Sequence, residues 1–177
     1  MITEKMRDAI NNQVNREIYS AYLYLSMSAY FESVKLKGFA HWMRMQVKEE
    51  MVHAAKLYDY LVQRGGRAVM LPIGEPPSEW ISPLEAFEHA SRHEHNVTGL
   101  ISDLVKVAAS ERDDDANNFL QWFVKEQVEE EESTGKVVQK IRGAGSDLSA
   151  LDRELAKRVF HPPKDETRSG AIKKKSR

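Results

Sequence analysis

Glycine and proline stand at only a few places in this sequence, and the segments between them are long. The 177 residues contain 9 glycines and 6 prolines, and the intervening segments are rich in Ala, Leu, Met, Glu, Lys and Gln, which favour helices. The alternation of apolar and polar residues typical of a half-buried strand is hard to find. The pattern predicts an all-α chain with four long helices and a short fifth one, at about residues 3–34, 38–65, 82–110, 113–143 and 146–160.

The longest gap between the predicted helices is rich in proline. Residues 67–81 hold three prolines and one glycine, and the next helix begins with a capping box formed by Ser82 and Glu85. Fifteen extended residues reach about 50 Å, and a helix of about 30 residues is ~45 Å long. Two tightly joined helix pairs connected by a crossover of that length are expected to pack as a four-helix bundle.

Charge and cysteine content limit the class of protein. The absence of cysteine excludes disulfides, thiolate metal sites and a thiol nucleophile, and it fits the reducing cytoplasm. Residues 164–177 hold six of the 26 basic and two of the 27 acidic residues, which leaves 20 basic against 25 acidic residues in 1–163. A body of that charge argues against a nucleic-acid partner.

The sequence also lacks the marks of a membrane protein. No apolar run approaches the ~20 residues of a membrane-spanning helix, and no signal peptide begins the chain. We therefore expect a soluble cytoplasmic protein without a membrane partner. Its organisation is expected to be one folded domain at 1–160 followed by a basic, flexible tail at 161–177.

Apolar residues spaced three and four apart trace one stripe along each long helix, as the core of a bundle requires. On the third helix, the predicted stripe is Phe87, Ser91, Glu94, Thr98, Ile101, Val105 and Ala108. Each stripe is interrupted near the middle of its helix by residue types that bind metal ions. In the order of the helices, the interruptions are Glu17; Glu50 and His53; Glu94; and Gln127 and Glu130.

Buried glutamates at one height of a bundle need a compensating charge. A buried carboxylate is costly unless it is paired or bound to a metal, and the stripes contain no Lys or Arg near these glutamates. A metal ion would remove the repulsion. The donors are oxygens and one imidazole without sulfur, which favours iron or manganese, with zinc as a competitor. Glu50 and His53, three residues apart, lie on one helix face and can reach the same ion.

The predicted centre is asymmetric. The second helix carries a complete Glu-x-x-His motif, whereas the fourth has Gln and Glu at the corresponding positions. We therefore expect Glu17, Glu50 and His53 to hold one ion more tightly, with Glu50 bridging to a second ion. The second ion is expected to bind Glu94 and, less firmly, Glu130 or Gln127.

Five motifs are spread over the four long helices. They are Asn15-Arg16-Glu17-Ile18-Tyr19-Ser20-Ala21-Tyr22-Leu23-Tyr24-Leu25, Glu49-Glu50-Met51-Val52-His53-Ala54, Phe87-Glu88-His89-Ala90 with Glu94, Phe119-Leu120-Gln121-Trp122-Phe123, and Glu126-Gln127-Val128-Glu129-Glu130. With these motifs, the sequence resembles the non-haem ferritins of bacteria and archaea over about residues 1–160. The resemblance implies a ferritin-like four-helix bundle with a long crossover between its second and third helices and a short fifth helix at a symmetry axis.

The resemblance also implies site residues. The ferroxidase centre, which binds two iron ions per subunit, would consist of Glu17, Glu50, His53, Glu94 and Gln127. A nearby third iron site would consist of Glu49, Glu126, Glu129 and Glu130. Redox-active roles are implied for Tyr24 and Trp122. Since Tyr24 stands seven residues, or two turns, after Glu17, its hydroxyl can also reach a metal ligand.

The activity implied by the resemblance is iron storage and detoxification. Ferritins form hollow cages of 24 subunits that oxidise Fe(II) with dioxygen or peroxide and store the Fe(III) product as a mineral. The alternatives are a haem-containing bacterioferritin-like protein, a di-metal oxygenase or peroxidase on the same bundle, and a bundle with purely structural carboxylates. Haem is not expected, because the Glu-x-x-His motif occurs only once in the centre.

The outer face of the second helix gives a further expectation about assembly. It is predicted to carry Trp42, Met45, Met51 and Tyr58, which is more apolar surface than a monomeric bundle leaves in water. Burial of this face between subunits would support the homo-oligomer.

Overall fold

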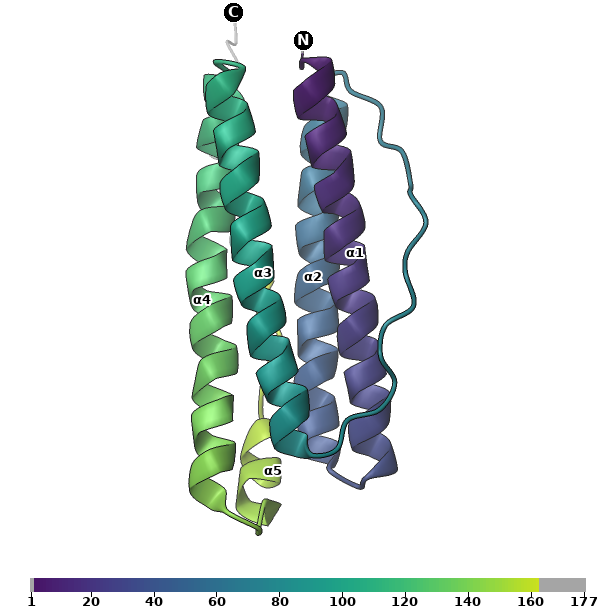
Figure 1. Ribbon diagram of the computed structural model, residues 1–177, viewed down its shortest axis with the longest axis vertical. Coiled ribbons are helices and arrows are strands. Elements are labelled where there is room, and N and C mark those ends of the chain that lie inside the picture. The colour runs from purple at the N-terminus through teal and green to yellow at the C-terminus, as the bar shows by residue number, and fades with distance from the viewer. Residues whose placement is uncertain (1, 163–177) are drawn as a thin grey trace, which may run out of the picture.

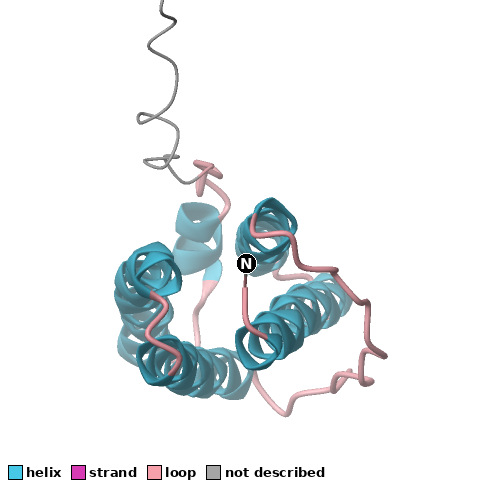
Figure 2. Ribbon diagram, turned by 90° about the horizontal axis from the view of Figure 1, so that it is seen from above, coloured by secondary structure: helices cyan, strands magenta, loops and turns pink. Residues whose placement is uncertain are grey.

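The computed structural model describes residues 2–162, in which five helices form a bundle (Figure 1). The helices are α1 (Glu4–Ser33), α2 (Lys37–Gln63), α3 (Pro83–Ser110), α4 (Asp114–Ala144) and α5 (Ser149–Leu155). Seen from above, the four long helices stand around a common core (Figure 2). The described residues contain no strand, so the predicted all-α bundle with a short fifth helix is confirmed.

No helix within residues 2–162 combines the length and the apolar character needed to cross a membrane. The predicted basic tail falls almost entirely on residues 163–177, which lie outside the described residues.

The crossover between α2 and α3 runs along the outside of the bundle beside α1 (Figure 1). Polar side chains of α1 hold it at both ends. Asn11 donates to the Arg67 carbonyl at 3.1 Å and accepts from the Val69 amide at 2.8 Å. Ser26 donates to the Pro77 carbonyl at 2.6 Å. The predicted crossover is therefore present, and it spans the length of the bundle.

The helix starts follow from local side-chain capping. The Ser82 hydroxyl accepts from the Glu85 amide at 3.1 Å, and the Glu85 carboxylate accepts from the Ile81 amide at 2.6 Å. The capping box thus closes one residue earlier than the usual pattern. At α4, Asp113 accepts from the Ala116 amide at 3.0 Å, and this bond satisfies one of the free amides at the helix start.

The core has two apolar clusters separated by a polar layer. The cluster around the start of α2 and the end of α1 includes Phe31, Phe39, Trp42, Met43 and Phe87. The cluster at the opposite end includes Ile10, Leu57, Ile101, Leu120 and Phe123. Between them, buried polar side chains come from all four long helices: Glu17, Ser20, Gln46, Glu50, His53, Glu94, Gln127, Glu130 and Thr134. Packing at both ends therefore fixes the height at which the polar side chains meet.

The predicted stripe on α3 is partly wrong. Ser91, Thr98 and Val105 are only half-buried. Instead, the apolar neighbours Ala90, Val97 and Leu104 are buried beside the correctly predicted positions. Since both sets fit a spacing of three and four residues, periodicity alone could not choose between them, and α3 turns its more apolar side to the core.

The fifth helix is shorter than predicted, because it ends at Leu155 and not near Phe160. Its middle is held against the start of α2: one Asp152 carboxylate oxygen accepts from the Gly38 amide at 2.7 Å and from the Phe39 amide at 3.1 Å. After α5, the Arg158 carbonyl accepts from His41 Nε2 at 2.8 Å. Residues 156–162 therefore lie outside the helix, and Arg158 in this segment contacts α2.

The expectation for the outer face of α2 is half right. Met51 and Tyr58 are exposed, at 48% and 44%. Trp42 and Met45 are buried within the chain itself. Trp42 packs edge-on against Phe87, with ring centroids 5.0 Å apart, and the Arg158 guanidinium covers its other side. The sequence did not indicate that cover, because it comes from the segment after α5.

Candidate metal centre

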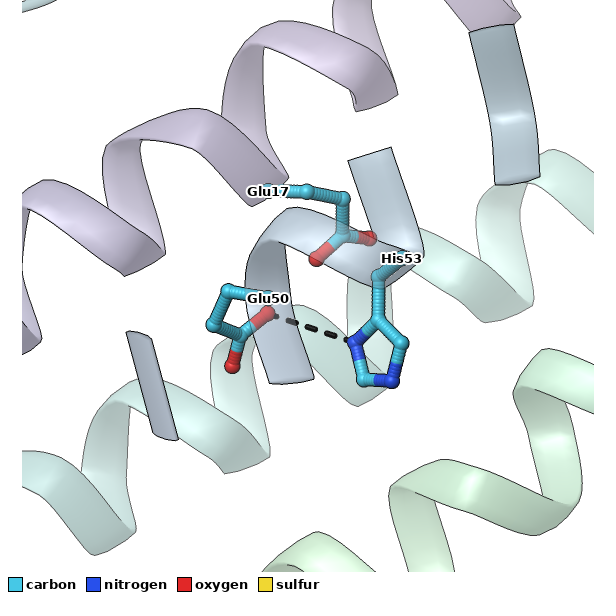
Figure 3. A group of neighbouring side chains, drawn as sticks. All are labelled: Glu17, Glu50 and His53. Atoms are coloured by element: carbon cyan, nitrogen blue, oxygen red, sulfur yellow. Dashed lines mark hydrogen bonds and ion pairs between the residues drawn. The ribbon is translucent and has the colours of Figure 1, made fainter. Parts of the chain in front are cut away.

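Three side chains from the first helix pair meet in the polar layer. Glu17 projects from α1, and Glu50 and His53 project from one face of α2 toward it (Figure 3). One possible ligand atom from each residue lies within 4.8 Å of the others, and all three residues are at most 2% exposed. His53 Nδ1 lies 3.3 Å from Glu50 Oε2. This cluster, called the inner centre below, is the group that the sequence predicted for the tighter ion.

The second helix pair completes the polar layer. Glu94 of α3 accepts a hydrogen bond from the Tyr24 hydroxyl and another from Gln127 Nε2, the latter at 3.3 Å. Glu130 of α4 is also buried. The structure therefore brings all the residues predicted for the two ions into one layer, and the predicted contact between Tyr24 and a candidate ligand is present.

Two glutamines orient the carboxylates from behind. Gln13 Nε2 donates to Glu17 Oε1 at 2.8 Å, and Gln46 Nε2 donates to Glu130 Oε2 at 2.8 Å. Neither glutamine was predicted from the sequence as part of the site. Gln13 stands four residues before Glu17, a spacing that brings side chains together on a helix, so this contact could have been found. The contact of Gln46 depends on how α2 packs against α4.

Burial and mutual repulsion raise the pKa values of the inner carboxylates. Burial raises the pKa of Glu50 well above its ordinary 4.5, and the charges of Glu94 and Glu17 raise it further. Burial, followed by the charge of Glu130, raises the pKa of Glu94 to about 8. Burial also raises the pKa of Glu17, although the neighbouring His53 opposes the shift. The inner centre therefore favours bound protons or a bound cation.

Unpaired atoms in the inner centre fit a metal ion. Glu17 Oε2 and His53 Nε2 are both buried and have no hydrogen-bond partner among the described residues. Buried polar atoms are normally paired, since an unpaired one carries its full desolvation penalty. Carboxylate oxygen and imidazole nitrogen are donors that iron, manganese and zinc accept. The donors thus match the ligand set expected from the sequence.

A second group of carboxylates lies beside the inner centre on the side of α2 and α4. Glu49, Glu126, Glu129 and Glu130 all line a pocket of about 670 Å³, called the outer carboxylate pocket below. His53 and Trp122 also line it, so it borders the inner centre. The structure thus brings together the four residues predicted for a third iron site.

The outer carboxylate pocket also contains Arg158, a cation that was not predicted from the sequence. Arg158 Nη2 lies 2.6 Å from Glu49 Oε2. Burial still raises the pKa of Glu49 to about 7, although the charge of Arg158 opposes the shift. Burial likewise raises the pKa of Glu126.

Both residues predicted to be redox-active lie beside the candidate ligands. Tyr24 is fully buried, and burial together with the charge of Glu94 raises its pKa well above 10. The Trp122 ring meets His53 edge-on with centroids 5.6 Å apart, and Lys56 Nζ lies 4.5 Å from the Trp122 ring centroid. Electron transfer by either side chain stays a prediction.

Comparisons with known proteins agree with this architecture. A family model described as a ferritin-like domain matches residues 7–144. The chain is 46% identical over 159 residues to a bacterial non-heme ferritin of Bacteroides fragilis, covering 89% of this chain and 100% of the relative. It is 36% identical over 163 residues to a bacterial non-heme ferritin of Staphylococcus saprophyticus, covering 90% and 98%.

A solved structure gives the same result at the level of the fold. The open pore ferritin from the archaeon Archaeoglobus fulgidus superimposes with a TM-score of 0.89 at 54% sequence identity, covering 90% of this chain and 100% of that one. Sequence, fold and the residues of the polar layer agree, and the chain belongs to the ferritin family.

Proposed function

We propose that the protein oxidises Fe(II) at the inner centre and stores the Fe(III) product inside a hollow homo-oligomer. The observation that supports this most directly is the convergence of Glu17, Glu50 and His53 in the core, with ligand atoms within 4.8 Å of one another. Membership of the ferritin family independently supports iron storage.

Iron is the substrate in this proposal, and the chain supplies its ligands. Two Fe(II) ions bind per subunit: Glu17, Glu50 and His53 hold one, and Glu50 bridges to another held by Glu94 and Gln127. Each Fe(II) loses one electron. Dioxygen takes up the two electrons with two protons to give hydrogen peroxide, or peroxide takes them up to give water. Carboxylates with raised pKa values release their protons when iron binds, which couples iron entry to proton release.

Exposed apolar side chains support the homo-oligomer. Tyr22 and Leu25 of α1 are 48% and 51% exposed, and Met51 and Tyr58 of α2 are similarly exposed. Apolar surface of this kind is normally covered by a partner, here other copies of the chain. From the family resemblance, we expect 24 subunits in a cytoplasmic cage.

Two measurements on the metal-free protein test the proposal. Stopped-flow absorbance should follow rapid oxidation of Fe(II) at about two equivalents per subunit, with the product of further additions kept in solution. Light scattering should give a particle many times the mass of one chain. Absence of fast oxidation would contradict the assigned centre, and a particle with the mass of a single chain would contradict the cage.

A further inference from the structure

The segment after α5 forms one wall of the outer carboxylate pocket. Val159, His161 and Pro162 line the pocket together with the glutamates of α2 and α4. The segment is held to α2 by the hydrogen bond from His41 to the Arg158 carbonyl at 2.8 Å. Lys48 Nζ lies 5.9 Å from the ring centroid of Phe160. Residues 156–162 lie outside any helix, and a segment held mainly by side-chain contacts can shift more easily than a helix of the bundle.

Arg158 points from this segment into the carboxylates. Its Nη2 is 2.6 Å from Glu49 Oε2, and the side chains of Arg158 and Glu49 are only 19% and 16% exposed. Its guanidinium carbon lies 4.2 Å from the centroid of the Trp42 ring, a stacking contact that orients the planar group. Its Nη1 is buried without a hydrogen-bond partner among the described residues. The guanidinium is therefore held by two contacts, and its Nη1 still has no hydrogen-bond acceptor among the described residues.

The Arg158 guanidinium is bonded to a carboxylate that a metal ion in this pocket would also use. Apart from Arg158, the charges that act most strongly on Glu49 are those of Glu130 and Glu126. A cation bound between these carboxylates has two ways to bind Glu49. It can share Oε2, to which Arg158 is bonded, or it can bind the other oxygen and lie close to the positive guanidinium. Both consequences weaken the binding of a divalent ion at this point.

We propose that Arg158 is a tethered cation that occupies Glu49 and competes with a third divalent ion for the outer carboxylate pocket. This inference rests on the proposed function, because it concerns the iron that passes beside the inner centre. A third ion binds only when Arg158 releases Glu49, and Arg158 favours its departure afterwards. The pocket therefore passes ions on and does not retain them. Arg158 acts here as a positioning residue, through Glu49.

The test is a calorimetric titration of the full-length, metal-free protein with Co²⁺ under anaerobic conditions, combined with the absorption spectrum of bound Co²⁺. Arg158→Gln removes the charge, and we expect the third ion to bind about tenfold more tightly, since an adjacent opposite charge has effects of that size. Arg158→Lys keeps a charge but cannot fork or stack in the same way, so its affinity should lie between the two. The matched control is Lys157→Gln, which removes the same charge from an exposed neighbour and should change nothing.

Each variant has an outcome that would contradict the proposed competition between Arg158 and a third ion. Unchanged or weaker binding of the third ion in Arg158→Gln would overturn the competition. An equal gain in affinity for the third ion in Lys157→Gln would show that the effect of Arg158→Gln comes from the net charge of the protein and not from the contact with Glu49. In Glu49→Gln, the third Co²⁺ should be lost while the first two remain, and retention of the third would show that it binds elsewhere. If the first two ions fail to bind wild-type protein, the proposed function is wrong, and that outcome is distinct from a failure confined to the third ion.

Discussion

Adjacent residues of α2 belong to two centres that differ in how their charge is compensated. Glu50 is 2% exposed and faces Glu17, Glu94 and His53 in the core. Glu49, one position and about 100° around the helix, faces the outer carboxylate pocket and pairs with Arg158 at 2.6 Å. The inner centre gathers carboxylates that repel one another, whereas the outer one already contains a cation.

The difference teaches that acidic residues alone do not define a metal site. The inner carboxylates are oriented by neutral donors such as Gln13 and Tyr24, which supply no positive charge to compensate them. The Glu49 carboxylate is partly neutralised by the chain itself. A divalent ion therefore stabilises the inner centre strongly, while in the outer pocket it must replace an existing interaction.

The largest effect is expected from Glu50→Ala. This substitution removes the residue proposed to bridge both ions, so the initial rate of Fe(II) oxidation should fall by about 100-fold. Stopped-flow absorbance measures the rate. The control is Glu132→Ala on α4, which removes an exposed glutamate paired with Lys136 and should oxidise iron at the wild-type rate. Equal rates in Glu50→Ala and wild type would show that the inner centre does not oxidise Fe(II).

The stability of the metal-free protein should fall as the pH rises. The pKa of Glu94 is about 8 in the folded protein against an ordinary 4.5, so its stabilising contribution is complete below pH 4.5 and is lost as the pH rises through about 8. Glu50 shifts in the same direction. Between pH 5 and 8, we expect the Tm of the metal-free protein to drop by at least ~3 °C, about the shift that 1 kcal/mol causes in a chain of this size.

Two further samples isolate the cause of that change. Loading with Zn²⁺ should flatten the pH dependence, because the ion binds the ionised carboxylates. Glu94→Gln should reduce the slope in the metal-free protein, because it removes one of the titrating groups. Scanning calorimetry gives all three profiles. A pH dependence that Glu94→Gln leaves unchanged would contradict the electrostatic description of the inner centre.

A glycine substitution should affect the outer pocket through α5. A Cβ added to Gly38 would lie 1.7 Å from the Asp152 carbonyl oxygen, so Gly38→Ala must push α5 away from α2. We expect a loss of about 2 kcal/mol and faster hydrogen exchange in residues 149–162, while the first two Co²⁺ ions still bind. The control is Gly99→Ala on α3, where a Cβ meets nothing within 4 Å, and this change should be neutral or stabilising. Normal exchange in Gly38→Ala would show that α5 does not depend on this contact.

The parts of the fold and of the inner centre that have local determinants could be predicted from the sequence. Helix caps at Ser82 and Asp113 and the spacing of Glu50 and His53 follow from neighbours within one or two turns. Glu17 lies on another helix and was matched to them only by its place in the middle of an apolar stripe. The outer pocket could be predicted only in part. Its glutamates belong to recognisable motifs, but Arg158 is 109 residues from Glu49, and nothing in the pattern joins the two. The end of α5 at Leu155 was also missed, and the segment that follows it contacts His41 of α2, a partner far away in the sequence.

The smallest effect is expected from Tyr24→Phe, which removes one hydrogen bond to Glu94 and leaves the ring in the core. This bond lowers the pKa of Glu94 against the larger influence of burial, so without it the carboxylate holds its proton more firmly. The second Co²⁺ should bind about fivefold more weakly, and the pH at which its binding is half-maximal should move upward. The control Tyr30→Phe removes a hydroxyl from the same apolar cluster, six residues further along α1, where the ring packs against Phe31 and Trp80. A packing defect in Tyr24→Phe would weaken Co²⁺ binding without shifting the pH at which binding is half-maximal, so this shift identifies the lost hydrogen bond. If both tyrosine variants behave like wild type, Glu94 is oriented without Tyr24, and the compensation of charge in the inner centre depends on burial and the carboxylates alone.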